Sequence, residues 1–177
     1  AYGEVTANNV LLVRCLECAA SMADELGSKA QANEYREEAE KRRTAINRFC
    51  WDEIHQGYVD TVRDKWAYLR YLELCRKNDW EVLAFDRYCS ASRISEQTNT
   101  LALICGCVTE AHEAAVWQIA QRPKHGRYQF GSPAARSYGV PAEHEVPDGI
   151  VAVGSPFFLF FSLEAFFQQH EGAGALE

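Results

Sequence analysis

The sequence predicts an all-α fold built from two layers of helices. Three segments contain a run that is apolar on nearly every side, and helices of this kind are buried. The first two are each followed by a segment with a narrow apolar stripe among charged residues, which is typical of a half-exposed helix. Short turns join the helices within each pair, whereas long loops lead into the next buried helix. We therefore expect two concentric layers, with the long loops gathered on one face.

The first helical hairpin is predicted over residues 8–49. Its first helix, 8–26, ends at Gly27, because glycine readily adopts the left-handed conformation that closes a helix. Ser28 and Gln31 match a capping box at the start of the second helix. That helix carries one narrow apolar stripe among many charged residues, so we expect it to face solvent on one side.

The second hairpin repeats this pattern between residues 95 and 123. Ser95 is the predicted N-cap of a helix that begins with the polar residues 96–100 and is then apolar on all sides until Gly106 ends it. Thr109 is the predicted N-cap of an amphipathic partner. This partner ends before Pro123, because a proline disfavours helical geometry in the residue that precedes it. A buried helix is again paired with a half-exposed one.

The third buried helix is predicted to start with Ser155 as its N-cap and Pro156 at its first helical position. Its first turns are rich in phenylalanine and leave no polar face. Two long loops, 50–94 and 121–154, lead into the second and third buried helices, and functional side chains often lie on loops of this kind. Within the first loop, the aromatic-rich segment 65–88 predicts one more helix.

The charge and composition of the chain limit its partners. The 177 residues are 47% hydrophobic and 24% charged, which is ordinary for a globular domain, and the net charge is −7. An acidic chain of this kind is poorly suited to neutralising phosphates, so we expect neither nucleic acid nor a membrane surface as a partner. The apolar run 149–163 is too short to span a bilayer and is interrupted by Ser155 and Pro156.

The sequence lacks the usual motifs for metals and cofactors. Its seven cysteines show no zinc-site spacing with histidine, and we interpret them as reduced core residues, which favours a cytoplasmic location. The five histidines are scattered, and we predict that they are solvated. Because no phosphate-binding loop, nucleophile elbow or dinucleotide fingerprint occurs, we expect no metal and no cofactor.

Polar and aromatic residues gather just before the predicted buried helices, on the face where the long loops meet. They are Tyr2, Glu4, Trp51, Asp52, Glu53, Gly57, Tyr58, Val59, Asp60, Glu96, Gln97, Thr98, Asn99, Gly154, Ser155 and Pro156. Aromatic rings stack on the C–H face of a pyranose while carboxylates and amides bind its hydroxyls, so this mixture suits a sugar. Asp60 and Glu96 are the first candidates for acid/base catalysis. In the alternative interpretation, Glu96 and Gln97 only complement the dipole of the helix that they begin.

Five segments carry a family resemblance in their order and spacing. They are Ala19–Gly27, Ala45–Glu53, Gly57–Asp60, Ser95–Leu103 and Gly154–Phe158. Taken in this order, they resemble the six-hairpin domain of glycoside hydrolase family 78, the bacterial α-L-rhamnosidases. The likeness covers most of the chain and is weakest over 63–93, which we interpret as an insertion, and over 123–146.

The resemblance implies an (α/α)6 barrel, in which residues 1–177 form a single domain with about three of the helical hairpins. It also implies hydrolysis of terminal α-L-rhamnosides with inversion, by one carboxylic acid and one carboxylate base. The family's acid precedes the helix that starts here near Thr6, and its base follows the helix matching 155–169. We therefore expect both outside this chain, which would be inactive alone. The positions that match the family's sugar pocket are Trp51, Tyr58, Asp60, Glu96, Gln97 and Ser155.

The same pattern also fits other interpretations. These are another six-hairpin glycosidase, a complete small enzyme that uses Asp60 and Glu96, and a helical-hairpin module that binds protein and uses the loop residues only as helix caps. A half ring would leave the apolar sides of its inner helices open to water. We therefore expect either a second copy of the chain or the remainder of the barrel to cover them.

Overall fold

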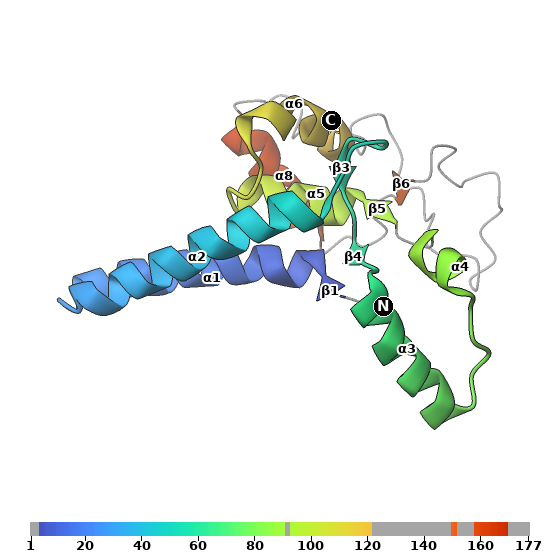
Figure 1. Ribbon diagram of the computed structural model, residues 1–177. Helices are drawn as coiled ribbons and strands as arrows, with labels where there is room; N and C mark the ends of the chain where they lie inside the picture. Colours follow the sequence, from blue (N-terminus) through green and yellow to red (C-terminus); the bar gives the residue numbers. More distant parts are fainter. Residues whose placement is uncertain (1–3, 91–92, 122–149, 152–157, 170–177) are drawn as a thin grey trace.

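The structure is a computed structural model that describes residues 4–90, 93–121, 150–151 and 158–169. Most of these residues lie in helices, which confirms the predicted all-α fold (Figure 1). Two long helices form an arm that extends from a body of shorter helices, and a further pair of helices lies on the other side of the body.

The arm consists of α1 (Thr6–Glu25) and α2 (Lys29–Phe49), which run antiparallel to each other. The turn between them contains Gly27, whose φ of +76° is the left-handed geometry that the sequence predicts at this position. The hydrophobic residues that the two helices bury are mostly small, which lets the helices approach closely. They are Val10, Val13, Ala20, Ala23, Ala32, Ala39 and Ile46.

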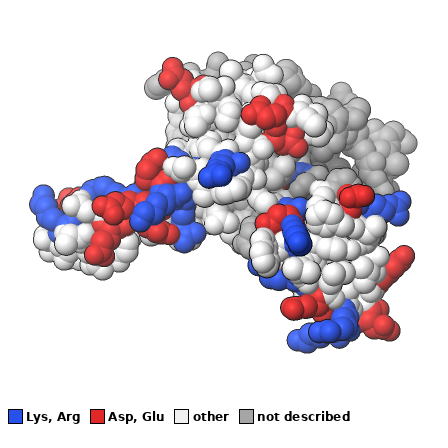
Figure 2. Space-filling view, viewed as in Figure 1, with Lys and Arg blue, Asp and Glu red and all other residues white. Residues whose placement is uncertain are grey.

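Charged side chains cover much of the arm (Figure 2). Ion pairs from Arg36 to Asp24 and from Arg43 to Glu17 join the two helices. Arg43 Nε also donates a hydrogen bond to the carbonyl oxygen of Gly106 at 2.8 Å, which ties the arm to the body. Because exposed ion pairs contribute little net stability, the buried apolar residues hold the arm together.

The helix α5 (Glu96–Ile104) lies at the centre of the body. It contacts α1, α6 (Glu110–Ala120) and α8 (Leu159–Gln168). Every residue of α5 is buried or half-buried, as the sequence predicts for an inner helix. This central position fixes the start of α5 relative to its neighbours.

Short strands of two residues each join the loop segments to the helix starts. Antiparallel pairs are formed by β1 (Glu4–Val5) with β4 (Thr61–Val62) and by β2 (Trp51–Asp52) with β3 (Gly57–Tyr58), and a parallel pair by β5 (Ile94–Ser95) with β6 (Ile150–Val151). Because β1 leads into α1 and β5 leads into α5, the segment 57–62 runs past the starts of two inner helices.

The segment 65–88, predicted as one helix, belongs to two helices, α3 (Lys65–Asn78) and α4 (Phe85–Ser90). Asp79 ends α3 because it adopts a left-handed conformation with φ 55°. This pair has a small core of its own, formed by Ala67, Tyr71, Cys75 and Tyr88.

The three inner helices differ in how far they are buried. α1 exposes Leu11 and Leu12, and α8 exposes Phe160 and Phe167, whose exposed fractions are 67% and 61%. Among the described elements, α5 has neighbours on several sides, whereas nothing covers these faces of α1 and α8. The described helices include none that is long and apolar enough to cross a membrane.

Two of the predicted helix caps are wrong in detail. Ser28 precedes α2 but makes no capping hydrogen bond, and Gln31 Nε2 donates to a tyrosine hydroxyl instead of completing a capping box. Thr109 likewise precedes α6 without a side-chain cap. The predicted helix start at 155–156 lies outside the described residues, and α8 is described from Leu159.

Candidate functional site

Five polar residues gather at the start of α5. This α5 cluster consists of Asp60, Ser95, Glu96, Gln97 and Thr98. Four of its members are consecutive at the helix start, whereas Asp60 comes from the segment between β3 and β4. The structure therefore brings three of the predicted site residues, Asp60, Glu96 and Gln97, to one helix end.

Asp60 is held from both its backbone and its side chain. Its carboxylate Oδ1 accepts hydrogen bonds from Ser95 Oγ at 2.6 Å and from Thr98 Oγ1 at 2.5 Å. Its amide donates to the carbonyl oxygen of Arg93 at 2.6 Å, and its own carbonyl oxygen accepts from the amide of Thr6 at 3.0 Å. Asp60 thus links the start of α1 to the start of α5, and its carboxylate has a fixed direction.

The N-cap of α5 confirms the prediction made for Ser95. Its Oγ accepts a hydrogen bond from the amide of Thr98 at 3.1 Å. Glu96, in the first turn, is only 3% exposed, and Gln97 beside it is half-buried. The positive end of the helix dipole stabilises the Glu96 carboxylate in the first turn. This role in helix stability is compatible with a role in ligand binding.

The predicted aromatic site residues form a second group, next to the core. The Trp51 ring stacks on the His112 ring with centroids 3.7 Å apart and meets the Tyr58 ring edge to face at 5.2 Å. Tyr58 is fully buried, and its hydroxyl donates to Asn47 Oδ1 at 2.6 Å. Burial raises the pKa of the Tyr58 hydroxyl well above its usual range. In this conformation the Tyr58 ring presents no surface to a ligand.

The carboxylate of Asp52, also predicted on the loop face, closes the hairpin between β2 and β3. Its Oδ1 accepts hydrogen bonds from the amides of Ile54 and His55, both at 2.9 Å, and contacts His55 Nδ1 at 3.2 Å. Burial alone would raise the pKa of Asp52, but these hydrogen bonds outweigh it and the pKa is lowered. Asp52 is therefore a turn residue.

The sequence does not predict the hydrogen bonds of Asn99 or the ring contact of His112. Asn99 is fully buried and bonds to the backbone of Tyr58 and of Ser95. His112 was predicted to be solvated, and this is wrong because its ring is half-buried against Trp51. The sequence gives no local signal for either role, because Asn99 stands among other polar residues at the start of α5.

The cysteines differ in how far they are buried. Cys15 and Cys18 are exposed, which corrects the prediction that they lie in the core, whereas Cys105 and Cys107 are buried. Burial raises the pKa of the Cys105 thiol to about 11 and that of the Cys107 thiol to about 12. These two thiols stay protonated at neutral pH and are therefore poor nucleophiles.

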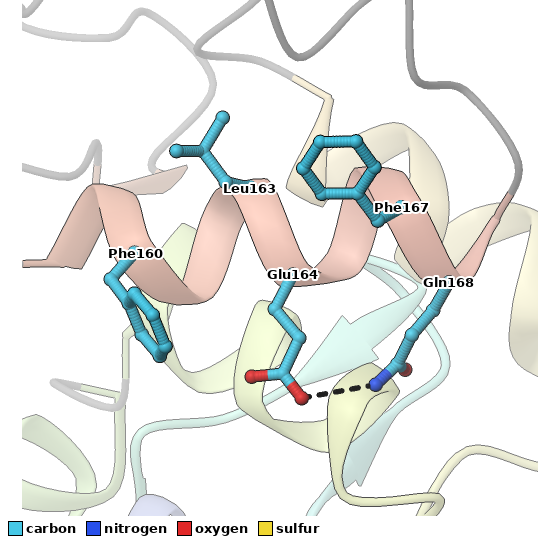
Figure 3. A pocket seen from close by; sticks show the side chains of 5 residues that line it. All are labelled: Phe160, Leu163, Glu164, Phe167 and Gln168. Atoms are coloured by element: carbon cyan, nitrogen blue, oxygen red, sulfur yellow. Dashed lines mark hydrogen bonds between the residues drawn. The ribbon is translucent and has the colours of Figure 1, made fainter.

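A shallow groove lies along α8, and its described lining residues all belong to that helix (Figure 3). They are Phe160, Leu163, Glu164, Phe167 and Gln168. The lining is mostly apolar, and it shares no residue with the α5 cluster. We place the candidate site at the α5 cluster because polar groups converge there. Ser155, the remaining predicted contact, lies outside the described residues.

Comparisons with known proteins agree with this fold. A family model described as a mannosylglycerate hydrolase MGH1-like glycoside hydrolase domain matches residues 2–138. The chain is also similar to the crystal structure of a family 78 rhamnosidase from Bacillus sp. GL1, with a TM-score of 0.65 and 23% identity. That similarity covers 97% of this chain but 13% of the rhamnosidase chain, and at this identity it shows a shared fold. No curated protein matches the chain.

Proposed function

The chain belongs to the family of mannosylglycerate hydrolase MGH1-like glycoside hydrolase domains, and on this premise we propose that its α5 cluster binds a sugar ring of a glycoside substrate. Asp60, Glu96 and Gln97 are the residues that we assign to this role. The observation that carries the proposal is the geometry of Asp60, whose carboxylate is fixed at the helix start by the hydroxyls of Ser95 and Thr98.

We assign Asp60 and Glu96 to binding rather than to proton transfer. Both side-chain hydrogen bonds of Asp60 use Oδ1, so Oδ2 is the oxygen best placed to accept a sugar hydroxyl. A glycosidase needs a catalytic acid and a catalytic base that both reach the scissile bond, and the resemblance to the rhamnosidases implies that this pair lies outside the chain. We therefore favour hydrolysis with inversion by an acid and a base outside this chain over the small enzyme that uses these two residues.

Three further positions resemble the family's sugar pocket, and we propose that two of them support Asp60 from the core. Tyr58 supports Asp60 from the core, because its ring is fully buried and it lies two residues before Asp60 in the chain. Trp51 supports Tyr58 through their edge-to-face contact. Ser155 stays a predicted sugar contact.

A terminal α-L-rhamnoside is the first substrate that we propose, and a mannosylglycerate is the second. The structural neighbour is a rhamnosidase, whereas the family description names mannosylglycerate. L-Rhamnose and D-mannose have the same relative configuration in mirror-image form, so each carries an axial hydroxyl beside the anomeric carbon. A fixed carboxylate such as that of Asp60 suits this hydroxyl in either sugar.

Isothermal titration calorimetry with L-rhamnose and with mannosylglycerate tests the site. We expect one of them to bind, and Asp60→Asn to weaken it about tenfold, because a charge-assisted hydrogen bond to the sugar becomes a neutral one. Asp86→Asn changes an exposed carboxylate in the first turn of α4 and should bind like the unmodified chain. Absence of binding to either sugar, or equal affinity of the Asp60 variant, would contradict the proposal.

A helical-hairpin module that binds protein is the second candidate function, and the exposed apolar residues of α8 favour it. The two candidates respond differently to the same titration. Sugar binding that depends on Asp60 supports the glycosidase site, whereas a module that uses these residues only as helix caps shows no sugar binding. In either case, we propose that a second copy of the chain or the remainder of the barrel covers the apolar faces.

A further inference from the structure

We infer that Asn99 is a positioning residue that fixes the Asp60 carboxylate against the start of α5. The role in sugar binding rests on the proposed function, whereas the positioning itself does not. Asn99 is fully buried, and its side-chain hydrogen bonds join Tyr58 and Ser95. Its Nδ2 donates to the carbonyl oxygens of Tyr58 at 3.0 Å and of Ser95 at 2.9 Å. Its Oδ1 accepts from the amide of Tyr58 at 2.8 Å.

These bonds close a ring around Asp60. The ring runs from Asn99 to the backbone of Tyr58, along the chain to Asp60, and from the Asp60 carboxylate to the hydroxyl of Ser95. The carbonyl oxygen of Ser95 then leads back to Asn99. The backbone of Tyr58, which precedes Asp60, and the backbone of Ser95, whose hydroxyl binds the Asp60 carboxylate, are thus both tied to the Asn99 side chain. Asp60 therefore cannot shift along α5 without breaking a hydrogen bond of this ring.

A second contact, which is partly buried, holds Tyr58 from its other end. The Tyr58 hydroxyl donates to Asn47 Oδ1 at 2.6 Å, and Asn47 Nδ2 donates to the carbonyl oxygens of Cys107 at 2.7 Å and of Arg43 at 2.9 Å. Asn47 belongs to α2 and Asn99 to α5. Tyr58 is thus fixed by its backbone to one helix and by its ring to another, which leaves the segment leading to Asp60 little freedom.

An amide is the side chain that this position requires. Nδ2 faces two carbonyl oxygens and Oδ1 faces an amide, so a carboxylate of the same size would place an oxygen against two oxygens. An apolar side chain of the same size would leave the amide and the carbonyl group of Tyr58 without the partners that Asn99 supplies, which is costly in a buried site.

The variant Asn99→Asp tests the inference without reference to sugar. We expect faster hydrogen exchange at the amides of Tyr58, Asp60 and Thr98 and a changed ¹³C chemical shift of the Asp60 carboxyl carbon. The carboxyl group introduced at position 99 faces two carbonyl oxygens, and this raises its pKa. When it is protonated, its O–H can again donate a hydrogen bond to one of these oxygens. Measured against the unmodified chain at the same pH, both differences should therefore diminish as the pH falls, whereas a loss of packing alone would leave the differences constant.

Two controls separate positioning from general destabilisation. Asn78→Asp makes the same chemical change in an exposed asparagine of α3 that donates to the carbonyl oxygen of Leu74. Val13→Ala truncates a fully buried side chain of α1 outside the ring of hydrogen bonds. Neither should change the Asp60 carboxyl shift.

An Asp60 carboxyl shift and Thr98 amide exchange that stay unchanged in Asn99→Asp would overturn the inference. In calorimetry, we expect Asn99→Asp to bind sugar about tenfold more weakly, as Asp60→Asn does. If the unmodified chain binds no sugar while Asn99→Asp still displaces Asp60, the proposed function fails and the positioning role stands.

Discussion

The absence of a side chain at Gly57 lets β3 approach the core next to the candidate site. A Cβ at this position would lie 2.6 Å from Ile119 Cδ1 and 3.2 Å from Ile94 Cγ2. Asn99 Oδ1, which binds the neighbouring amide of Tyr58, would lie 3.4 Å away. At the residue scale, this close approach of backbone to core allows Asn99 to reach β3.

The variant Gly57→Ala should therefore destabilise the chain by about 2 kcal/mol, because the added methyl group overpacks the core. Ile119→Val removes the Cδ1 atom that is contacted first, so the double variant should regain part of the loss. Urea unfolding followed by circular dichroism measures both. Gly27→Ala is the matched control: its strain comes from φ alone, with no atom within 4 Å, so Ile119→Val should not rescue it. Equal stability of Gly57→Ala and the unmodified chain would contradict this packing.

The buried thiols of Cys105 and Cys107 make the free energy of unfolding vary with pH in the alkaline range. Their pKa values are raised to about 11 and about 12, whereas an unfolded cysteine has a pKa of about 8.5. Above about pH 8.5 the unfolded chain releases these protons first, so the free energy of unfolding falls as the pH rises toward the folded pKa values. Each thiol should contribute up to about 1 kcal/mol per pH unit in this range.

Cys107→Ala removes one of these groups and should lessen the fall in stability between about pH 9 and 11. Unfolding in urea across this pH range provides the measurement. Cys18→Ala, at an exposed position, should leave the pH dependence as it is in the unmodified chain. An identical pH dependence in Cys107→Ala would show that this thiol does not titrate differently in the folded chain.

At the scale of elements, α3 and α4 form a unit whose core is separate from that of the body. The Tyr88 ring stacks on Tyr71 at 5.0 Å and contacts Tyr68 at 5.2 Å, and the guanidinium of Arg63 lies 5.1 Å from its centroid. The main core contains none of these rings. This separation is the physical basis for treating the segment 63–93 as an insertion, as we propose.

The variant Tyr88→Ala should unfold α3 and α4 while α1 and α2 stay folded. Loss of a buried aromatic ring destabilises a fold by about 3–5 kcal/mol. We expect this to exceed the free energy of local unfolding of α3 and α4, because their core is small. Hydrogen exchange measured by mass spectrometry should show lost protection in 65–90 only. Phe85→Ala, at a ring that is 43% exposed, is the control with a smaller effect. Uniform loss of protection across the chain would instead show that the two cores are coupled.

At the scale of the whole molecule, the apolar faces left open on α1 and α8 predict association. Contiguous exposed apolar surface is typical of an interface, and Phe160 and Phe167 are the most exposed large apolar residues of α8. Both lie on the α8 groove (Figure 3). A second copy of the chain or the remainder of the barrel would bury them.

Replacing both Phe160 and Phe167 with serine should reduce self-association of the chain and its binding of a hydrophobic dye. Size-exclusion chromatography with light scattering measures the first effect and fluorescence the second. Ile54→Ser removes an isolated residue that is 87% exposed at the tip of the β2–β3 hairpin, so it should change neither. A monomeric unmodified chain that binds no dye would argue against an open apolar face.

Most of the helices and the inner position of α5 follow from the sequence alone, whereas the segment 65–88 belongs to two helices instead of the predicted one. The apolar periodicity of the sequence, Gly27 and Ser95 are local signals, and local signals set where α1 and α5 begin or end. The order of its motifs also indicated a glycoside hydrolase fold, and the family match supports this. Side-chain caps at Ser28 and Thr109 failed because the geometry of a helix start depends on how the preceding turn packs.

Which residues meet at the site depends on contacts between distant parts of the chain. The hydrogen bond from Ser95 to Asp60 joins residues 35 positions apart, and the bonds from Asn99 to Tyr58 join residues 41 positions apart. The sequence placed Asp60, Glu96 and Tyr58 on one loop face, but the structure buries Tyr58 and gives the fixing role to Asn99. The physical reason is that a buried polar group must find its partners wherever packing brings them, and no local pattern records those partners.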